Sequence, residues 1–400
     1  MPSGSDASAS VPPRRRVLAA LATAANALYV LSLQILALVT LDPTQFGLFS
    51  IQYLLFALAS SLTLSIVSEP WLRRTIHERV EGGWREYSTV LAWLSLTVAI
   101  VTLVVSLLVP PLRDVAWLGA AAVFLSAYRT GARYHDVRSG RWKRVLFADS
   151  TGCAAIVGAW VAGWALELHP LLAIVVSWAC GALVTSVFSP LPRMLGLGTV
   201  RRWLTIHRAH VAPLLRDSIL LDVGAIGTPF VVAGALGITN FGIYRAVSNI
   251  AAPVRLLLNP LRPTLSSIPL AVNARASTRA IAIAVGAAFG AGAFVALWLV
   301  GVLTVDLGAL SAVVPFAFPT AVFVAANFLG HYYYILARSH SHSRGLMAGR
   351  IVQTMLAIAM PLFGVVAFGL AGAIWGYALA TVLSAATWFA IVASRSAPEQ

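Results

Sequence analysis

The sequence predicts an all-α integral membrane protein of about 12 transmembrane helices, arranged as two parallel six-helix bundles around a central cavity. Composition is the first reason: 59% of the 400 residues are hydrophobic and 10% are charged, whereas about 25% of the residues of a soluble domain are usually charged. The second reason is that apolar runs of roughly 20 residues, enough to cross about 30 Å of hydrocarbon, recur along the whole chain. The third is that basic residues gather in every second loop between these runs.

The apolar runs are bounded by charged residues, prolines and glycines, and they fall into two sets of six predicted helices. The first set covers residues 17–41, 46–68, 88–109, 115–130, 148–166 and 170–190. The second set covers residues 211–233, 241–265, 280–304, 309–337, 351–368 and 371–393. The run that begins at Val17 is too long for the core of a cleavable signal, so we expect it to be the first transmembrane helix.

The remaining segments are polar or basic and define the predicted domain boundaries. The N-terminal tail is rich in Ser, Ala and Pro and cannot bury a core, so we expect it to be disordered. The predicted division is a disordered cytoplasmic tail at 1–16, a first six-helix bundle at 17–190, a basic cytoplasmic linker at 191–210, a second six-helix bundle at 211–393 and a cytoplasmic tail at 394–400.

The basic residues indicate how the chain is oriented. Most of the 28 lie after the second, fourth, sixth, eighth and tenth predicted helices. They include Arg73, Arg74, Arg129, Arg133, Arg193, Arg201, Arg275, Arg338, Arg344 and Arg350. The alternate loops are short, and their single cation is Arg113. By the positive-inside rule, the basic loops and both termini are predicted to be cytoplasmic.

The net charge of +14 follows from this topology and from attraction to the anionic headgroups of the bilayer. No nucleic-acid partner is therefore expected. Arg is strongly preferred over Lys and Ala is abundant, which is typical of a GC-rich bacterial genome and indicates a plasma (inner) membrane. Cys153 and Cys180 both fall in apolar runs, and neither a disulfide, a metal site nor a cofactor is predicted.

The two sets of helices share a sequence motif. Residues 42–49 read DPTQFGLF and residues 237–244 read GITNFGIY, 195 positions further on. Thr, Phe and Gly match at equivalent positions, and each copy joins the first helix of its set to the second. An offset of six helices preserves orientation, so the sequence predicts parallel repeats related by an axis along the membrane normal.

Three segments at these joints resemble the polysaccharide transport family of the multidrug/oligosaccharidyl-lipid/polysaccharide (MOP) superfamily. They read LDPTQFGLFSIQYLL, LGITNFGIYRAVSNI and, near the end of the chain, FGLAGAIWGYALATVLS. The superfamily contains O-antigen flippases, lipid II flippases and MATE exporters. The resemblance implies a transporter of two six-helix bundles and leaves the substrate open.

The predicted helix at 241–265 carries a polar face. On a helical wheel its polar residues fall within an arc of about 140°. They are Arg245, Asn249, Arg255, Asn259 and Arg262, together with Ser248. An ionisable group in the bilayer is costly and normally faces a polar cavity, so we predict that this face binds an anionic substrate. For Arg245 and Arg262, snorkelling to the headgroups is the alternative.

The preceding helix, 211–233, contributes Arg216, Asp217 and Asp222. We expect Arg216 either to complete the cavity or to snorkel, and Asp222 to be the ion partner of Arg255 or a protonatable coupling site. Asp217 is a second candidate for coupling or ion pairing. Few other predicted helices carry charge, so charge within the membrane is expected mainly in the second half. His331, Tyr332, Tyr333 and Tyr334 indicate an interfacial aromatic belt or, alternatively, a sugar-stacking surface.

Together, the resemblance and the arginine face predict a flippase rather than an enzyme. Its cargo would be an anionic polyprenyl-(pyro)phosphate-linked oligosaccharide, moved to the outer leaflet by alternating access, with polysaccharide polymerases or glycosyltransferases as partners. No P-loop pattern is present, so direct use of ATP is not expected. The alternatives are a proton- or sodium-coupled exporter of drugs or metabolites, a membrane glycosyltransferase or polymerase, and a non-transporting scaffold.

Overall fold

The computed structural model describes residues 13–77, 83–267, 270–273, 275–340 and 343–396. Within these residues every regular element is helical, which confirms the predicted all-α membrane fold class. The tails predicted at 1–16 and 394–400 fall largely outside the described residues, since the first helix begins at Pro13 and the last ends at Ser396.

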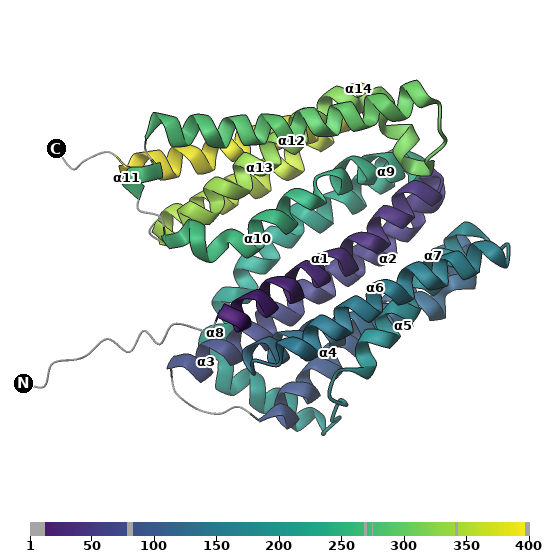
Figure 1. The fold of residues 1–400 in the computed structure, drawn as a ribbon, viewed down its shortest axis with the longest axis vertical. Helices are drawn as coiled ribbons and strands as arrows, with labels where there is room; N and C mark the ends of the chain where they lie inside the picture. Colours follow the sequence, from purple (N-terminus) through teal and green to yellow (C-terminus); the bar gives the residue numbers. More distant parts are fainter. Residues whose placement is uncertain (1–12, 78–82, 268–269, 274, 341–342, 397–400) are drawn as a thin grey trace, which may run out of the picture.

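The first half of the chain packs as one group of helices, in which α1 and α2 lie beside α5, α6 and α7 (Figure 1). Its elements are α1 (Pro13–Thr40), α2 (Pro43–Leu62), the π-helix η1 (Thr63–Ser68), α3 (Glu69–His77), α4 (Trp84–Leu108), the 3-10 helix η2 (Pro110–Val115), α5 (Ala116–Arg138), α6 (Trp142–Ala165) and α7 (Pro170–Val187). We call α1–α7 the first half.

The second half packs as another group, in which α13 contacts α10, α12 and α14. The elements of this part of the chain are α8 (Leu197–Asp222), the π-helix η3 (Val223–Gly227), α9 (Thr228–Ile250), α10 (Ala252–Ser267), α11 (Leu270–Asn273), α12 (Ala276–Leu303), the 3-10 helix η4 (Gly308–Phe316), α13 (Ala317–His340) and α14 (Ser343–Ser396). We call α9–α14 the second half, and α8 connects the two. Two helices are broken, α9 at Gly237 with φ 77° and α14 at Phe368 and Gly369.

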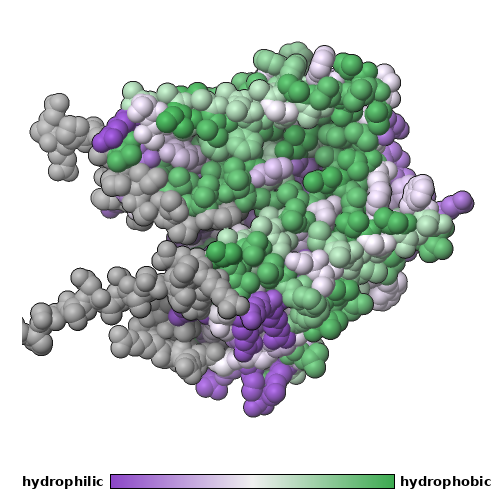
Figure 2. Space-filling model, in the orientation of Figure 1, coloured by the Kyte–Doolittle hydropathy of each residue, from purple (hydrophilic) through white to green (hydrophobic). Residues whose placement is uncertain are grey.

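The described helices include nine stretches that are long and apolar enough to cross a membrane. Two of these, Leu197–Leu258 and Arg344–Ser394, contain the breaks at Gly237 and Gly369 and are long enough for more than one crossing. The chain is therefore a multi-pass membrane protein, while the count of twelve helices stays a prediction. Apolar side chains cover the middle of the visible face, and hydrophilic ones gather toward its margins (Figure 2).

The two matching motifs meet in space. The hydroxyl of Thr44 lies 2.8 Å from that of Thr239, and Gly47 faces Gly242 so closely that a Cβ on Gly242 would lie 1.7 Å from the carbonyl oxygen of Pro43. The helices α2 and α9 thus contact each other backbone to backbone. This contact joins the halves at the end that carries the short loops, which we call the short-loop end; the opposite end, with the basic loops, is the basic-loop end.

A second contact seals the short-loop end. The amide of Ala309 in η4 donates a hydrogen bond of 2.7 Å to the carbonyl oxygen of Leu41, which follows α1. Gly308, with φ 56°, packs directly on the backbone of Leu41. Gly308 leaves no room for a side chain, so the two halves fit closely here.

The segment predicted as a linker, 191–210, is largely helical, because α8 begins at Leu197. Its first turns dock on the first half: the indole of Trp203 is buried and donates to the carbonyl oxygen of Ile66 at 3.1 Å. The other end of α8 contacts the second half, where the Thr354 hydroxyl donates to the carbonyl oxygen of Leu220 at 2.9 Å. Pro213 lies between these two docking points, inside the helix.

The first half contains a buried ion cluster that the sequence analysis missed. Asp149 is 1% exposed and accepts hydrogen bonds from Arg129 at 3.0 Å and from Arg133 at 2.9 Å. Asp136, fully buried, lies 3.4 Å from Arg141 and 3.9 Å from Arg129. Buried charge is therefore present in the first half as well as in the second.

The physical reason is that α5 does not end near residue 130, as predicted, but continues to Arg138. Arg129 and Arg133 lower the hydropathy of this stretch and were counted as loop residues. Because carboxylates of α5 and α6 neutralise them, the helix can continue with its charges inside the bundle.

We predict that the stability of the protein depends on the close contact between Gly47 and Gly242. Replacing Gly242 with alanine forces the backbone of Pro43 to shift, and overpacking of this kind costs about 1–3 kcal/mol. We expect Gly242→Ala to lower the thermal unfolding midpoint in detergent. The matched control is Gly234→Ala on the same helix, where an added Cβ meets nothing within 4 Å. Equal midpoints for the two variants would contradict the close contact.

We predict that the ion cluster is required for folding of the first half. Asp149→Asn leaves Arg129 and Arg133 without their shared carboxylate, and removal of one partner of a buried ion pair costs about 3–5 kcal/mol. The control, Asp114→Asn, makes the same substitution at an exposed position. Thermal unfolding should separate them, and a normal midpoint for Asp149→Asn would show that the cluster adds no stability.

Candidate functional site

A cavity of about 390 Å³ lies between the two halves. The first half contributes Ser61, Leu64, Ser65 and Glu69 to its wall, from the end of α2 through η1 to the start of α3. The opposite wall comes from α8, α9, α10, α13 and α14. Both π-helices, η1 and η3, face the cavity, and π-helices are frequent at functional sites.

The cavity lies toward the basic-loop end. Two of its lining residues, Arg338 and Arg350, stand on either side of the loop between α13 and α14. At the other end the halves are held together by the Thr44–Thr239 and Leu41–Ala309 contacts. The cavity is thus closed on one side of the membrane by direct contact between the halves.

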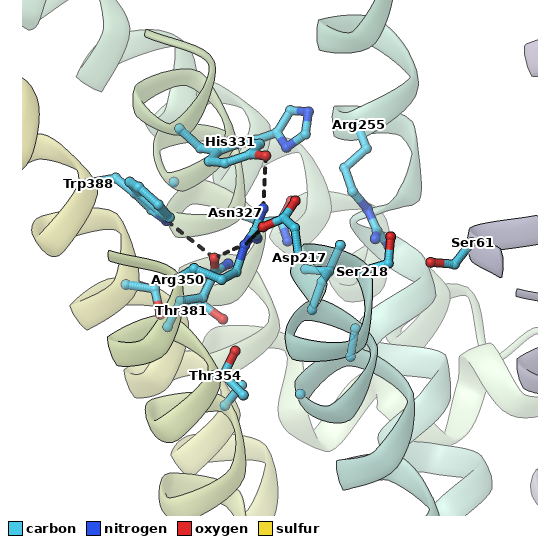
Figure 3. A pocket seen from close by; sticks show the side chains of 18 of the residues that line it. Ser61, Asp217, Ser218, Arg255, Asn327, His331, Arg350, Thr354, Thr381 and Trp388 are labelled. Carbon is cyan, nitrogen blue, oxygen red and sulfur yellow. Dashed lines mark hydrogen bonds and ion pairs between the residues drawn. The ribbon is translucent and has the colours of Figure 1, made fainter. Parts of the chain in front are cut away.

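Arg255, from α10, lines this cavity. Its side chain extends toward Ser61 of α2 and Ser218 of α8 (Figure 3). Within the described part of the chain, Arg255 makes no hydrogen bond and no ion pair. Its guanidinium therefore offers uncommitted donors to whatever enters the cavity.

Arg350, at the start of α14, is in the opposite situation. It is 5% exposed, and its Nε lies 3.3 Å from Asp217, its Nη1 3.1 Å from Gln353 and its Nη2 2.8 Å from the hydroxyl of Tyr334. The guanidinium also lies over the ring of Tyr334, 4.7 Å from its centroid. Arg350 is consequently fixed in place, and Figure 3 shows it beside Asp217.

Asp222 ends α8 immediately before η3 and is half-buried. Its neighbour on the first half is Ser61 of α2, and its Oδ2 atom has no hydrogen-bond partner. None of the ion pairs described joins Asp222 to Arg255. The predicted pairing of these two residues is thus not found, since Asp222 faces a serine instead.

The predicted polar face of residues 241–265 does not come together at the cavity. Arg245 is 9% exposed and packs among Tyr53, Tyr244 and Tyr377 rather than at the cavity surface. Asn249 is half-buried and lies away from the cavity wall. The reason is the interruption at Ala251, which separates α9 from α10 and breaks the continuous wheel assumed from the sequence.

One of the other three predicted side chains, that of Arg216, is described, and two are not. Arg216 is exposed and lies off the cavity, whereas its neighbour Asp217 lines it. The side chains of Arg262 and Asn259 lie outside the described residues. Of the six predicted substrate-binding residues, Arg255 is the one that the described structure brings to the cavity.

Most of the cavity wall formed by α13 was not predicted from the sequence. Asn327, His331, Tyr334 and Arg338 line the cavity at spacings of four, three and four residues, which is one face of a helix. That periodicity could have identified them. Instead, Arg338 and Arg350 were counted as loop cations, and Tyr332 and Tyr333, which were grouped with His331 and Tyr334, turn away from the cavity toward Asn273 and Phe389.

Comparison with known proteins bears on the fold. No protein-family model and no curated protein matches the chain. Among solved structures, it is similar to a multidrug resistance MATE family transporter of the MOP superfamily in its inward-facing conformation, with 13% identity over 93% of this chain and 94% of that one and a TM-score of 0.67. The chain has the fold of a MATE transporter. The outward-facing conformation of a MATE family transporter gives 14% identity over 96% and 94%, with a TM-score of 0.57.

A eukaryotic MATE transporter is also similar, at 12% identity, with 96% of this chain and 97% of that one covered and a TM-score of 0.52. These likenesses cover 93–96% of this chain, so the similarity of fold extends over both halves. The inward-facing structure gives the higher of the first two TM-scores. In this chain the cavity is closed at the short-loop end. Membership of the flippase family that the sequence resembles is not decided by these likenesses.

We predict that water-soluble reagents reach Arg255 but not its neighbours on the lipid side. In a background with Cys153 and Cys180 replaced by serine, Arg255→Cys should react with a cationic methanethiosulfonate in open membrane fragments. Leu257→Cys is the control, because Leu257 is 50% exposed on the same helix yet lies off the cavity. Mass spectrometry measures the labelling, and equal labelling at both positions would place Arg255 outside an aqueous cavity.

Proposed function

We propose that the chain is a flippase that moves an anionic polyprenyl-(pyro)phosphate-linked oligosaccharide from the inner to the outer leaflet. The observation that carries this proposal is the uncommitted guanidinium of Arg255 in a cavity between two halves. Arg is suited to phosphate because its planar, permanently charged guanidinium donates two parallel hydrogen bonds. Polysaccharide polymerases or glycosyltransferases would be its partners.

The cavity has the size of a lipid headgroup rather than of a whole lipid. Its volume of about 390 Å³ is at the small end of ligand pockets, which suits a pyrophosphate with its first sugar. The polyprenyl chain would remain in the bilayer, against the apolar outer surface of the helices. Alternating access would then require the short-loop contacts to open as the basic-loop end closes.

The membrane potential could assist such export. Moving one charge across 100 mV is worth about 2.3 kcal/mol, so a cargo with two negative charges leaving a negative interior gains roughly 4–5 kcal/mol. Arg255 would hold this charge during the crossing, because an unpaired anion within the membrane is expensive.

A coupled exporter of drugs or metabolites is the second candidate. Two of the similar structures are multidrug resistance MATE family transporters, and the Oδ2 atom of the half-buried Asp222 has no hydrogen-bond partner. A carboxylate of this kind could bind a proton or sodium ion. Asp217 is a weaker candidate, because Arg350 already neutralises it. The solved structures that resemble this chain are transporters, which favours neither the glycosyltransferase nor the polymerase alternative.

Transport of a fluorescent lipid-linked oligosaccharide in proteoliposomes tests the proposal. We expect wild-type protein to move it and Arg255→Ala to reduce the rate at least tenfold, since a hydrogen bond to a charged group contributes about 1.5–3 kcal/mol. Arg202→Ala removes an exposed arginine of α8 and serves as the control.

Equal rates for wild type and Arg255→Ala would contradict the role of Arg255. No transport by either, together with cationic-dye export that requires an ion gradient and fails in Asp222→Asn, would favour the exporter.

A further inference from the structure

A second arginine of the cavity wall has N–H donors that the described structure does not use. Arg338, in the last turn of α13, lines the cavity and is exposed. Its Nη1 atom donates a hydrogen bond of 3.0 Å to the hydroxyl of Tyr334, and the described structure gives it no other hydrogen bond. Most of its five N–H donors are therefore unengaged in the described structure, at a residue that lines the cavity.

The hydroxyl of Tyr334 accepts hydrogen bonds from two arginines. It accepts one hydrogen bond from Arg338 at 3.0 Å and another from Arg350 at 2.8 Å. A phenol oxygen has two lone pairs, so both are occupied, and its own hydrogen is left to be donated elsewhere. In the described structure this hydroxyl only accepts, which leaves its O–H available to a ligand.

Arg338 and Tyr334 together thus present donors and no acceptor to the cavity. Arg350 fixes this pair from behind, because Asp217 and Gln353 hold it in place. The acids that act electrostatically on Arg338 are Glu69 and Asp217. Asp217 is already paired with Arg350, so Glu69, on the opposite wall, is the one remaining competitor for Arg338.

We propose that Arg338 and the hydroxyl of Tyr334 form a second anion subsite in the same cavity, separate from Arg255. A donor-only pair of this kind suits a carboxylate or phosphate oxygen and disfavours a cationic drug. The cargo would therefore carry two anionic groups: the (pyro)phosphate on Arg255 and an acidic group of the saccharide on Arg338. This inference rests on the proposed function and specifies its substrate class.

Binding of two synthetic probes to the full-length protein tests the subsite. Both are short-chain prenyl pyrophosphates; one carries a single glucuronate and the other a single glucose. We expect the wild type to bind the glucuronate probe roughly tenfold more tightly, as a charge-assisted hydrogen bond allows. Arg338→Gln should remove most of this preference, and Tyr334→Phe should reduce it. Arg255→Gln should weaken both probes to a similar extent.

The control is Arg344→Gln, which removes an exposed arginine near the same loop but off the cavity. It should retain the preference for glucuronate. The thermal unfolding midpoint of each variant separates loss of binding from loss of folding, and Arg338→Gln is the safer variant because its side chain is exposed.

The other outcomes would reject the second subsite, the proposed function or both. Binding of both probes with equal affinity, still dependent on Arg255, would reject the second subsite and leave the proposed function standing. Failure of the wild type to bind either probe would reject the proposed function and the subsite with it. If the preference is present in phosphatidylcholine nanodiscs and lost when phosphatidylglycerol is added, the subsite binds a lipid headgroup and not the cargo.

Discussion

The close contact between Gly47 and Gly242 is the constraint on which the arrangement of this protein depends. Two helices from different halves meet there without side chains between them, and the adjacent threonine hydroxyls add a polar contact of 2.8 Å. The backbones touch at the short-loop end, and the cavity between the halves lies toward the opposite end. The fold and the site therefore share one origin, a short motif that occurs twice in the sequence.

Five arginines of the described structure illustrate three different environments, which hydropathy does not distinguish. Arg129 and Arg133 are neutralised by Asp149 inside the first half. Arg350 is buried, paired with Asp217 and used to hold Tyr334. Arg255 and Arg338 remain available at the cavity surface. Only the last group can bind an anion from outside, so the number of arginines near a site says less than the number of their free donors.

The sequence predicted the fold class well, because apolar composition and helix length are properties of the chain itself. It also identified the repeated motif, although not that its two copies touch. Prediction of the site was weaker. Arg255 reaches the cavity, but Arg245 does not, since an interruption at Ala251 separates α9 from α10. Arg338 and Arg350 were missed because a charge near a helix end looks the same whether it faces headgroups or a cavity.

The connecting helix α8 has a mechanical consequence. Trp203 anchors one part of it to the first half, and Leu220 is bonded to Thr354 in the second. Any rocking of one half against the other must then either release an anchor or bend the rod between them. Pro213 lies in that interval and lacks the amide hydrogen that would stiffen it. Because α8 is attached to both halves, its bending stiffness opposes their relative motion. That stiffness therefore helps to set how readily the halves move against each other.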